Sequence, residues 1–197
     1  MTERTRHTFV VYVEDKPGVL NRVASLFRRR GFNIDSLTVG HAETPDASRM
    51  TVVVDTDAIG ARRLEANLYK LVNVLRVRDI TSVPAVFREL AMVKVTATAE
   101  TRTHIMQLVD VFRARVVDVA PDSLVVETTG TEAKIKGLLE VLRPYGIVEL
   151  VRTGRVGMAR GPHSVMVDPA GTSDPGPTAD GDDTDTDGED PNVSFSV

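Results

Sequence analysis

An aspartate and a glycine, three positions apart, stand where a predicted strand ends and a predicted helix begins. Residues 9–13 are apolar β-formers typical of a buried strand, and apolar residues recur at helical spacing from Val19 onward. Between them, Pro17 suits the first turn of a helix, and Gly18 lets another molecule approach the backbone closely. A helix start of this kind has free N–H groups, which bind carboxylates and other anions. The sequence therefore predicts an anion site beside Asp15.

From spacing alone, an ordinary strand-to-helix turn without a ligand remains the alternative. Further strings of residues favour a binding site, because together they resemble one known family. The turn resembles the ligand loop of ACT domains, small regulatory modules that sense amino acids. The wider match, over about residues 7–160, resembles the small regulatory subunit of acetolactate synthase (acetohydroxyacid synthase). Its strings are Asp15-Lys16-Pro17-Gly18-Val19-Leu20, Arg30-Gly31-Phe32-Asn33-Ile34-Asp35-Ser36-Leu37-Thr38-Val39, Ser48-Arg49-Met50-Thr51 and Lys70-Leu71-Val72-Asn73-Val74.

The resemblance implies a protein with no catalytic activity of its own. Subunits of this family are expected to bind the catalytic large subunit of acetolactate synthase, raise its activity and confer feedback inhibition by valine. They would act in the biosynthesis of the branched-chain amino acids valine, isoleucine and leucine, as homodimers. No cofactor is expected on this chain, because thiamine diphosphate and Mg²⁺ would sit on the catalytic subunit.

The resemblance also implies an allosteric valine site between two protomers. The N–H groups of Gly18, Val19 and Leu20 are expected to bind the carboxylate of the ligand, and Asp15 is expected to accept from its ammonium group. Many relatives have asparagine where this chain has Asp15. The added charge favours an ammonium group but repels a carboxylate.

Two further residues complete that predicted site, and the first of them, Asn33, would reach it from the facing protomer. Asn33 would bridge the carboxylate or the amine of the ligand through its amide group. Ile34, together with Val19, would form the walls of a pocket for a short branched side chain. Leucine and isoleucine remain open as additional ligands.

The hydrophobic pattern predicts the order β-α-β-β-α-β twice, which is the ferredoxin-like arrangement of an α+β fold. The first unit, the ACT domain, covers residues 7–82, with helices over 17–30 and near 64–72. Within its second strand, expected over 32–41, the apolar residues change from even to odd positions. A strand can bury both sets on one face only with an irregularity, which predicts a bulge near residues 35–36.

The second unit repeats the first after a short connection. Residues 83–88 are expected to be a linker, because Pro84 interrupts any strand there. The C-terminal ferredoxin-like domain then covers residues 89–160, with Thr131 as the N-cap of its last helix and a closing strand over 147–153. Domains of about 75 residues bury little surface, so pairing with a second copy is expected.

The composition divides the chain into a mildly basic body and an acidic tail. Residues 161–197 carry nine acidic and no basic residues and few apolar ones, so a disordered tail is expected. The remainder has 24 basic against 19 acidic residues. These charges are scattered. An RNA-binding module with this strand order needs aromatic residues for stacking on its central strands, and the sheet positions here hold Val, Met, Thr and Leu, so no nucleic acid is expected. The absence of cysteine fits a cytoplasmic protein without thiolate metal sites.

No other site chemistry emerges from the sequence. The four histidines are scattered without carboxylates at ligand spacing, and no signal peptide or membrane span is expected. Two alternative functions remain. One is an ACT-type sensor that regulates a different biosynthetic enzyme, with a ligand such as serine or threonine. The other, a transcriptional regulator, would need a DNA-binding segment, but the two domains and the tail already occupy the chain.

Overall fold

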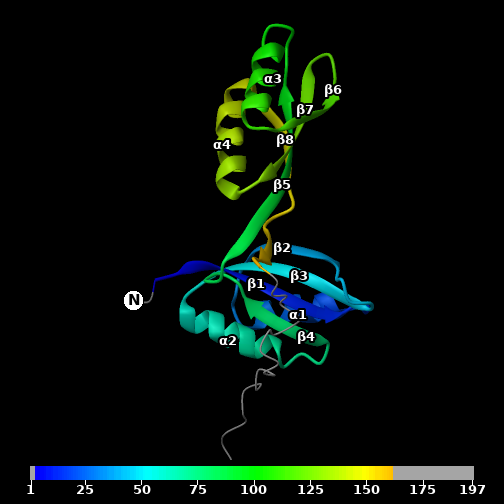
Figure 1. Cartoon of the computed structure of the whole chain (residues 1–197), viewed down its shortest axis with the longest axis vertical. Coiled ribbons are helices and arrows are strands. Elements are labelled where there is room, and N and C mark those ends of the chain that lie inside the picture. Colours follow the sequence, from blue (N-terminus) through cyan, green and yellow to red (C-terminus); the bar gives the residue numbers. More distant parts are fainter. Residues whose placement is uncertain (1–2, 162–197) are drawn as a thin grey trace, which may run out of the picture.

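The structure, a computed structural model, describes residues 3–161 of the 197-residue chain. The predicted disordered tail lies outside these residues from position 162 onward. Two domains of alternating strands and helices lie end to end, and the long strand β5 runs from one to the other (Figure 1).

The N-terminal domain has the predicted ferredoxin-like arrangement. Its four antiparallel strands lie in the order β2-β3-β1-β4, and the apolar sides of α1 and α2 pack on one face of the sheet. Phe9, Phe27 and Leu64 are among the fully buried side chains of this core. The elements are β1 (Thr5–Glu14), α1 (Val19–Arg29), β2 (Ile34–His41), β3 (Ala47–Thr56), α2 (Ala58–Leu68) and β4 (Val74–Asp79).

The predicted bulge in β2 is confirmed. The pairing of β2 with β3 shifts register between Ile34 and Ser36, so that Ile34 and Leu37, of opposite parity, both pack against the same core. The second helix is shorter than predicted and ends at Leu68. Leu71 still packs on the core from the following turn, whereas Val72 is 92% exposed. The helical spacing of these residues therefore misplaced the end of the helix.

The second domain repeats the arrangement, with strand order β6-β7-β5-β8 and the helices α3 and α4 packed on its core. Val93, Val95 and Val126 lie at the centre of that core. The elements are β5 (Ala85–Thr96), α3 (Arg102–Val111), β6 (Arg115–Val119), β7 (Ser123–Gly130), α4 (Glu132–Leu142), a short 3₁₀ turn η1 (Arg143–Tyr145), β8 (Ile147–Arg152) and β9 (Val156–Ala159).

The expected linker is largely strand. Pro84 does mark a boundary, but β5 begins at the next residue, and residues 85–88 pair with β9, an element that the sequence pattern did not predict. A four-residue strand that contains a glycine has little β-propensity of its own, and it forms here because β5 extends beyond the second sheet. The connection is therefore a two-stranded ribbon.

This ribbon covers the sheet face of the first domain that the helices leave open. Val10, Tyr12 and Ile80 are buried there against Ala85 and Phe87. As a consequence, residues 8–13 of β1 are buried on both faces, which explains why this strand is an almost continuous apolar run.

Thr131 caps α4 as predicted, because its hydroxyl oxygen accepts a hydrogen bond from the backbone N–H of Lys134 at 3.3 Å. Thr131→Ala is expected to lower the free energy of unfolding by about 1 kcal/mol, the usual cost of losing an N-cap. Urea denaturation would measure it, and Thr131→Ser, which keeps the hydroxyl group, should stay near the wild type. Equal losses in both variants would contradict the capping role.

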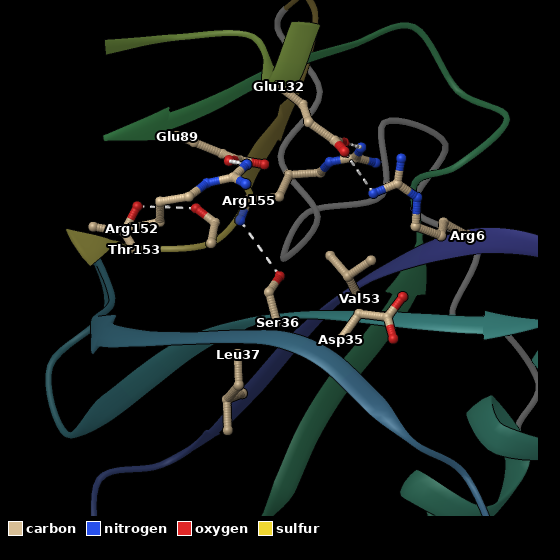
Figure 2. A pocket seen from close by; sticks show the side chains of 11 residues that line it. Arg6, Asp35, Ser36, Leu37, Val53, Glu89, Glu132, Arg152, Thr153 and Arg155 are labelled. Atoms are coloured by element: carbon tan, nitrogen blue, oxygen red, sulfur yellow. Dashed lines mark hydrogen bonds and ion pairs between the residues drawn. The ribbon is translucent and has the colours of Figure 1, made fainter. Parts of the chain in front are cut away.

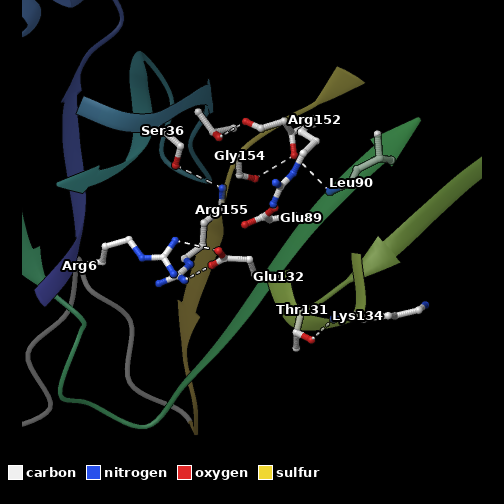
Figure 3. Close-up of polar contacts among 12 residues, drawn as sticks. Arg6, Ser36, Glu89, Leu90, Thr131, Glu132, Lys134, Arg152, Gly154 and Arg155 are labelled. Atoms are coloured by element: carbon white, nitrogen blue, oxygen red, sulfur yellow. Dashed lines mark hydrogen bonds and ion pairs between the residues drawn. The ribbon is translucent and has the colours of Figure 1, made fainter. Parts of the chain in front are cut away.

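A polar cluster joins the two domains. Glu132, in the first turn of α4, binds Arg6 of β1 at 2.9 Å and Arg155 at 3.0 Å (Figure 3). Arg155 also donates to the hydroxyl of Thr8 at 3.3 Å and lies over the ring of Phe87, 5.2 Å from its centroid. We call these five residues the interdomain junction.

An open pocket of about 440 Å³ lies beside the interdomain junction (Figure 2). Residues of both domains line it, including Asp35, Ser36 and Val53 from the first, and Glu89 and Arg152 from the second. The Glu89 side chain is nearly buried and is paired with Arg152. Beside the apolar contact made by the ribbon, this part of the contact between the domains is thus polar and incompletely filled.

The interdomain junction should weaken in acid. The hydrogen bond from Arg6, above all, holds the pKa of the Glu132 carboxyl below its ordinary value of 4.5. A lowered pKa in the folded state favours folding above pH 4.5, and that contribution is lost as the pH falls through the folded value. The melting temperature of Glu132→Gln should therefore lie below that of the wild type at neutral pH, and the difference should shrink below pH 4.5. A difference that stays constant with pH would contradict this.

Candidate ligand-binding site

The turn between β1 and α1 presents an open helix start. Gly18 occupies the N-cap position with φ of 84°, and no side chain caps the helix there. The N–H groups of Gly18, Leu20 and Asn21 have no acceptor among the described residues. A Cβ placed on Gly18 would meet no atom within 4 Å. The turn therefore combines free donors, the positive end of a helix dipole and room for an incoming group, which together favour an anion.

Asp15 lies beside this helix start and is held in place by the neighbouring hairpin. Its Oδ1 accepts a hydrogen bond from the Ser48 hydroxyl at 3.1 Å, and its Oδ2 lies 3.2 Å from His41 Nδ1. Its backbone N–H donates to the carbonyl of Asp46 at 2.8 Å. The carboxylate remains partly exposed, so it can accept from a cationic group of a ligand while Ser48 fixes its orientation.

Asn73 ties the turn to α1 from the other side. Its backbone carbonyl accepts from the N–H of Glu14 at 2.9 Å, and its amide nitrogen donates to the Glu14 carboxylate at 2.5 Å. Its amide oxygen accepts from Arg22 of α1 at 2.6 Å. The hydrogen bond from Asn73, followed by that from Lys16, holds the pKa of Glu14 below its ordinary value. Asn73 therefore fixes the relative positions of the strand end and the helix start.

Val19 and Leu20, two of the predicted site residues in α1, differ in how far their side chains are exposed. The Val19 side chain is 4% exposed and belongs to the hydrophobic core, so it does not form the pocket wall that we expected. Its N–H group points back to the carbonyl of Lys16 at a long 3.3 Å. Leu20, by contrast, is 44% exposed, so its side chain can contact a ligand at the helix start.

Asn33 and Ile34 lie at the opposite end of β2 from the turn. In the register of the sheet Ile34 pairs with Val54, whereas His41, next to Asp15, pairs with Ser48. Seven strand positions correspond to roughly 23 Å. Asn33 is exposed, and its amide nitrogen lies 3.4 Å from the Asp35 carboxylate. One chain therefore does not bring the two groups of predicted residues together.

Sequence reasoning missed three residues that shape the turn: His41, Ser48 and Asn73. Ser48 and Asn73 stand in strings already noted for their resemblance, but their contacts with the turn depend on how the strands pair. His41 could have been found from the hairpin, since a short turn near residue 46 places the end of β2 beside the start of β3.

Within residues 3–161, no three side chains among His, Asp and Glu gather closely enough to hold a metal ion. No helix in that range is long and apolar enough to cross a membrane.

Two ferredoxin-like domains in tandem, the first with a glycine-capped helix start after its first strand, define a protein of the ACT-domain class. Comparison with known proteins specifies the family. Residues 9–76 match the ACT domain of the acetohydroxyacid synthase small-subunit type, and residues 88–161 match the family described as the small subunit of acetolactate synthase. The chain belongs to the acetolactate synthase small-subunit family.

Individual members of this family are similar to the chain over most of its length. The acetolactate synthase small subunit of Mycolicibacterium smegmatis is 50% identical over 159 residues, which are 81% of this chain and 94% of the relative. The probable acetolactate synthase small subunit of Archaeoglobus fulgidus is 51% identical over 156 residues, 79% of this chain and 98% of the relative. The crystal structure of the small subunit from Thermotoga maritima has a TM-score of 0.76 at 40% identity and covers 80% of this chain and 98% of its own.

Proposed function

We propose that this chain is a regulatory subunit that binds the catalytic large subunit of acetolactate synthase, raises its activity and makes it sensitive to feedback inhibition by valine. The observation that carries the proposal is the open, glycine-capped start of α1 beside Asp15, in a chain of this family. The chain itself supplies no catalysis in this proposal, and thiamine diphosphate and Mg²⁺ belong to the catalytic subunit.

The chemistry of an α-amino acid matches the turn. The carboxylate of valine would accept from the N–H groups of Gly18 and Leu20, where the helix dipole favours an anion. Its ammonium group would donate to Asp15, whose Oδ1 is already oriented by Ser48. Leu20 offers an exposed apolar side chain for the ligand's isopropyl group. Each of these contacts is local to the turn and needs no rearrangement of the domain.

The other half of the proposed site comes from a second copy of the chain. Asn33 and Ile34 are too far from Asp15 to reach the same ligand within one protomer. A homodimer in which the Asn33 end of β2 faces the partner's turn would complete two equivalent sites by symmetry. Valine has about eight heavy atoms, and at a moderate ~0.6–0.8 kcal/mol per atom its Kd would be near 0.1 mM. A site of that affinity responds to a changing metabolite concentration.

Titration calorimetry of the purified chain tests the ligand. Valine is expected to bind at one molecule per chain, and serine and threonine should bind at least tenfold more weakly, since their hydroxyl groups do not suit an apolar contact with Leu20. Tighter binding of serine or threonine would favour the alternative, an ACT-type sensor for a different biosynthetic enzyme.

Reconstitution tests the partner. Adding this chain to the separately purified catalytic subunit should raise the rate of acetolactate formation from pyruvate, and valine should lower that rate again. The chain alone should form no acetolactate. Turnover without the catalytic subunit, or a catalytic subunit whose rate does not respond to the chain, would contradict the proposed function.

A further inference from the structure

The strand β2 carries two sets of residues with different contacts. At its beginning lie Asn33 and Ile34, the residues proposed to contact valine from the second protomer. Directly beyond the bulge, Ser36 and Thr38 contact the C-terminal domain, and Asp35 lines the pocket between the domains. Only two positions separate Ile34 from Ser36. A change in the position of this part of β2 therefore reaches the other domain directly.

The contact beyond the bulge is tight. The Ser36 hydroxyl accepts from the backbone N–H of Arg155 at 3.4 Å (Figure 3). The Thr38 hydroxyl donates to the carbonyl of Thr153 at 3.1 Å. Between these two bonds lies Gly154, with φ of 81°. A Cβ at Gly154 would stand 2.6 Å from the Ser36 Cβ, well inside contact distance. The β8–β9 turn thus rests on β2 through a glycine that no larger residue can replace without displacement.

Arg155 connects this contact to the second domain. Its backbone N–H meets Ser36, while its side chain binds Glu132 at the first turn of α4. Arg6, from β1, binds the same carboxylate. The Glu132 side chain is 32% exposed, so its ion pairs with Arg6 and Arg155 remain accessible to solvent. A polar junction beside an open pocket can adopt a second arrangement with little cost in packing, which is what an allosteric connection requires.

We propose that the contact of Ser36 with Gly154 and Arg155, together with the Arg155–Glu132 pair, transmits ligand occupancy at β2 to the C-terminal domain. The proposal rests on the proposed function, because it assumes that valine contacts Asn33 and Ile34. In physical terms, the ligand and the partner subunit would be coupled through the angle between the two domains, which this contact sets. Coupling of this kind typically changes affinity by about 5–150-fold.

The first test releases the ion pairs. Glu132→Gln removes the charge that holds Arg6 and Arg155 and keeps a side chain of the same shape. Glu127→Gln is the matched control, because Glu127 also pairs with an arginine of the C-terminal domain, Arg115, but lies outside the interdomain junction. Both variants would be studied as full chains, alone by calorimetry and in complex with the catalytic subunit.

The expected result separates the binding of valine from the transmission of its effect to the C-terminal domain. In Glu132→Gln, the valine affinity of the free chain should stay within about twofold of the wild type, and the catalytic subunit should still be activated. The ratio of activity without valine to activity at saturating valine should fall toward one. Glu127→Gln should keep the wild-type ratio. Full inhibition of the Glu132→Gln complex at the wild-type valine concentration would overturn the proposal.

The second test displaces the turn. Gly154→Ala should push β2 away from the β8–β9 turn and abolish transmission, because the new Cβ would stand 2.6 Å from the Ser36 Cβ. Gly146→Ala is the control for backbone strain: its φ is 93°, and its Cβ would come no nearer than 3.4 Å to any atom. If Gly146→Ala has the same effect, or the Gly154→Ala complex is still fully inhibited by valine, the contact is not the connection.

A readout without the catalytic subunit keeps the two hypotheses apart. In the wild-type chain, valine should change amide hydrogen exchange in the first turn of α4, near Glu132, and the change should be absent in Gly154→Ala. If valine does not bind the wild type at all, the proposed function fails and this proposal with it. If valine binds and inhibits but exchange in α4 is unaffected, the proposed function stands and the transmission proposal is overturned.

Discussion

Replacement of Gly18 by aspartate is expected to abolish inhibition by valine while leaving activation of the catalytic subunit largely intact. The new carboxylate would occupy the place proposed for the carboxylate of valine, at the open start of α1. Two unit charges about 4 Å apart repel by about 1–4 kcal/mol near a protein surface. Together with the loss of free N–H groups, this should weaken valine binding on the order of 100-fold or more. At an affinity near 0.1 mM, such a change removes inhibition at any practical valine concentration.

The structure supplies a matched control for this substitution. A Cβ at position 18 would meet no atom within 4 Å, so the structural cost of replacing Gly18 comes mainly from its left-handed backbone conformation. Asparagine and aspartate tolerate that conformation better than other residues, at a cost of roughly 1–2 kcal/mol. Gly18→Asn has the same shape and backbone cost as Gly18→Asp but no charge, so it should weaken valine binding clearly less than Gly18→Asp does. Equal losses in both variants would show that the site does not bind a carboxylate at this turn.

Valine is also expected to shift the monomer–dimer equilibrium by about four orders of magnitude. If each dimer holds two ligands that touch both chains, each site stabilises the dimer by about 2.7 kcal/mol when valine is present at 100 times its Kd. Two sites lower the dissociation constant of the dimer about 10⁴-fold. Sedimentation velocity on a dilution series, with and without about 10 mM valine, would measure the shift.

The variant Asn33→Ala distinguishes a shared ligand from other sources of stabilisation. Asn33 is exposed in the single chain, so its removal should not disturb the fold. The dimer without valine should be nearly unchanged, and the valine-dependent shift should largely disappear. Asn21→Ala is a useful comparison, because Asn21 is exposed on α1 and is not proposed to contact the ligand through its side chain. A wild-type dimer whose dissociation does not depend on valine would contradict the shared-site geometry.

Features governed by neighbouring residues were predicted well from the sequence. The bulge in β2 follows from the change of its apolar residues from even to odd positions. The glycine at the start of α1 and the threonine cap of α4 follow from the preferences of these residue types for turns and helix ends. A local preference also explains the end of α1, where Gly31 stands in the left-handed conformation and the N–H of Phe32 donates to the carbonyl of Phe27 at 3.0 Å.

Features that depend on distant residues were missed. The strand β9 exists because β5 extends beyond its own sheet, and nothing in residues 156–159 indicates that partner. The burial of Val19 depends on the rotation of α1 over the sheet, and the contacts of Asn73 depend on where β4 begins. In the candidate site, the sequence predicted the donors of the helix start, but not the His41 and Ser48 contacts that position Asp15.

The ribbon formed by β5 and β9 has a consequence for the synthesis of the chain. The open sheet face of the first domain, with Tyr12 and Ile80, is covered by Phe87 and then by β9, where Gly157 packs against both Ile80 and Phe87. A ribosome that adds roughly 5–20 residues per second needs about 4–15 s to proceed from Ile80 to Gly157. During that interval the helices of the nascent first domain can form, but its second sheet face is not yet covered by the complete ribbon. We therefore expect chaperones to bind the nascent chain at this face, and fragments that end before residue 85 to aggregate.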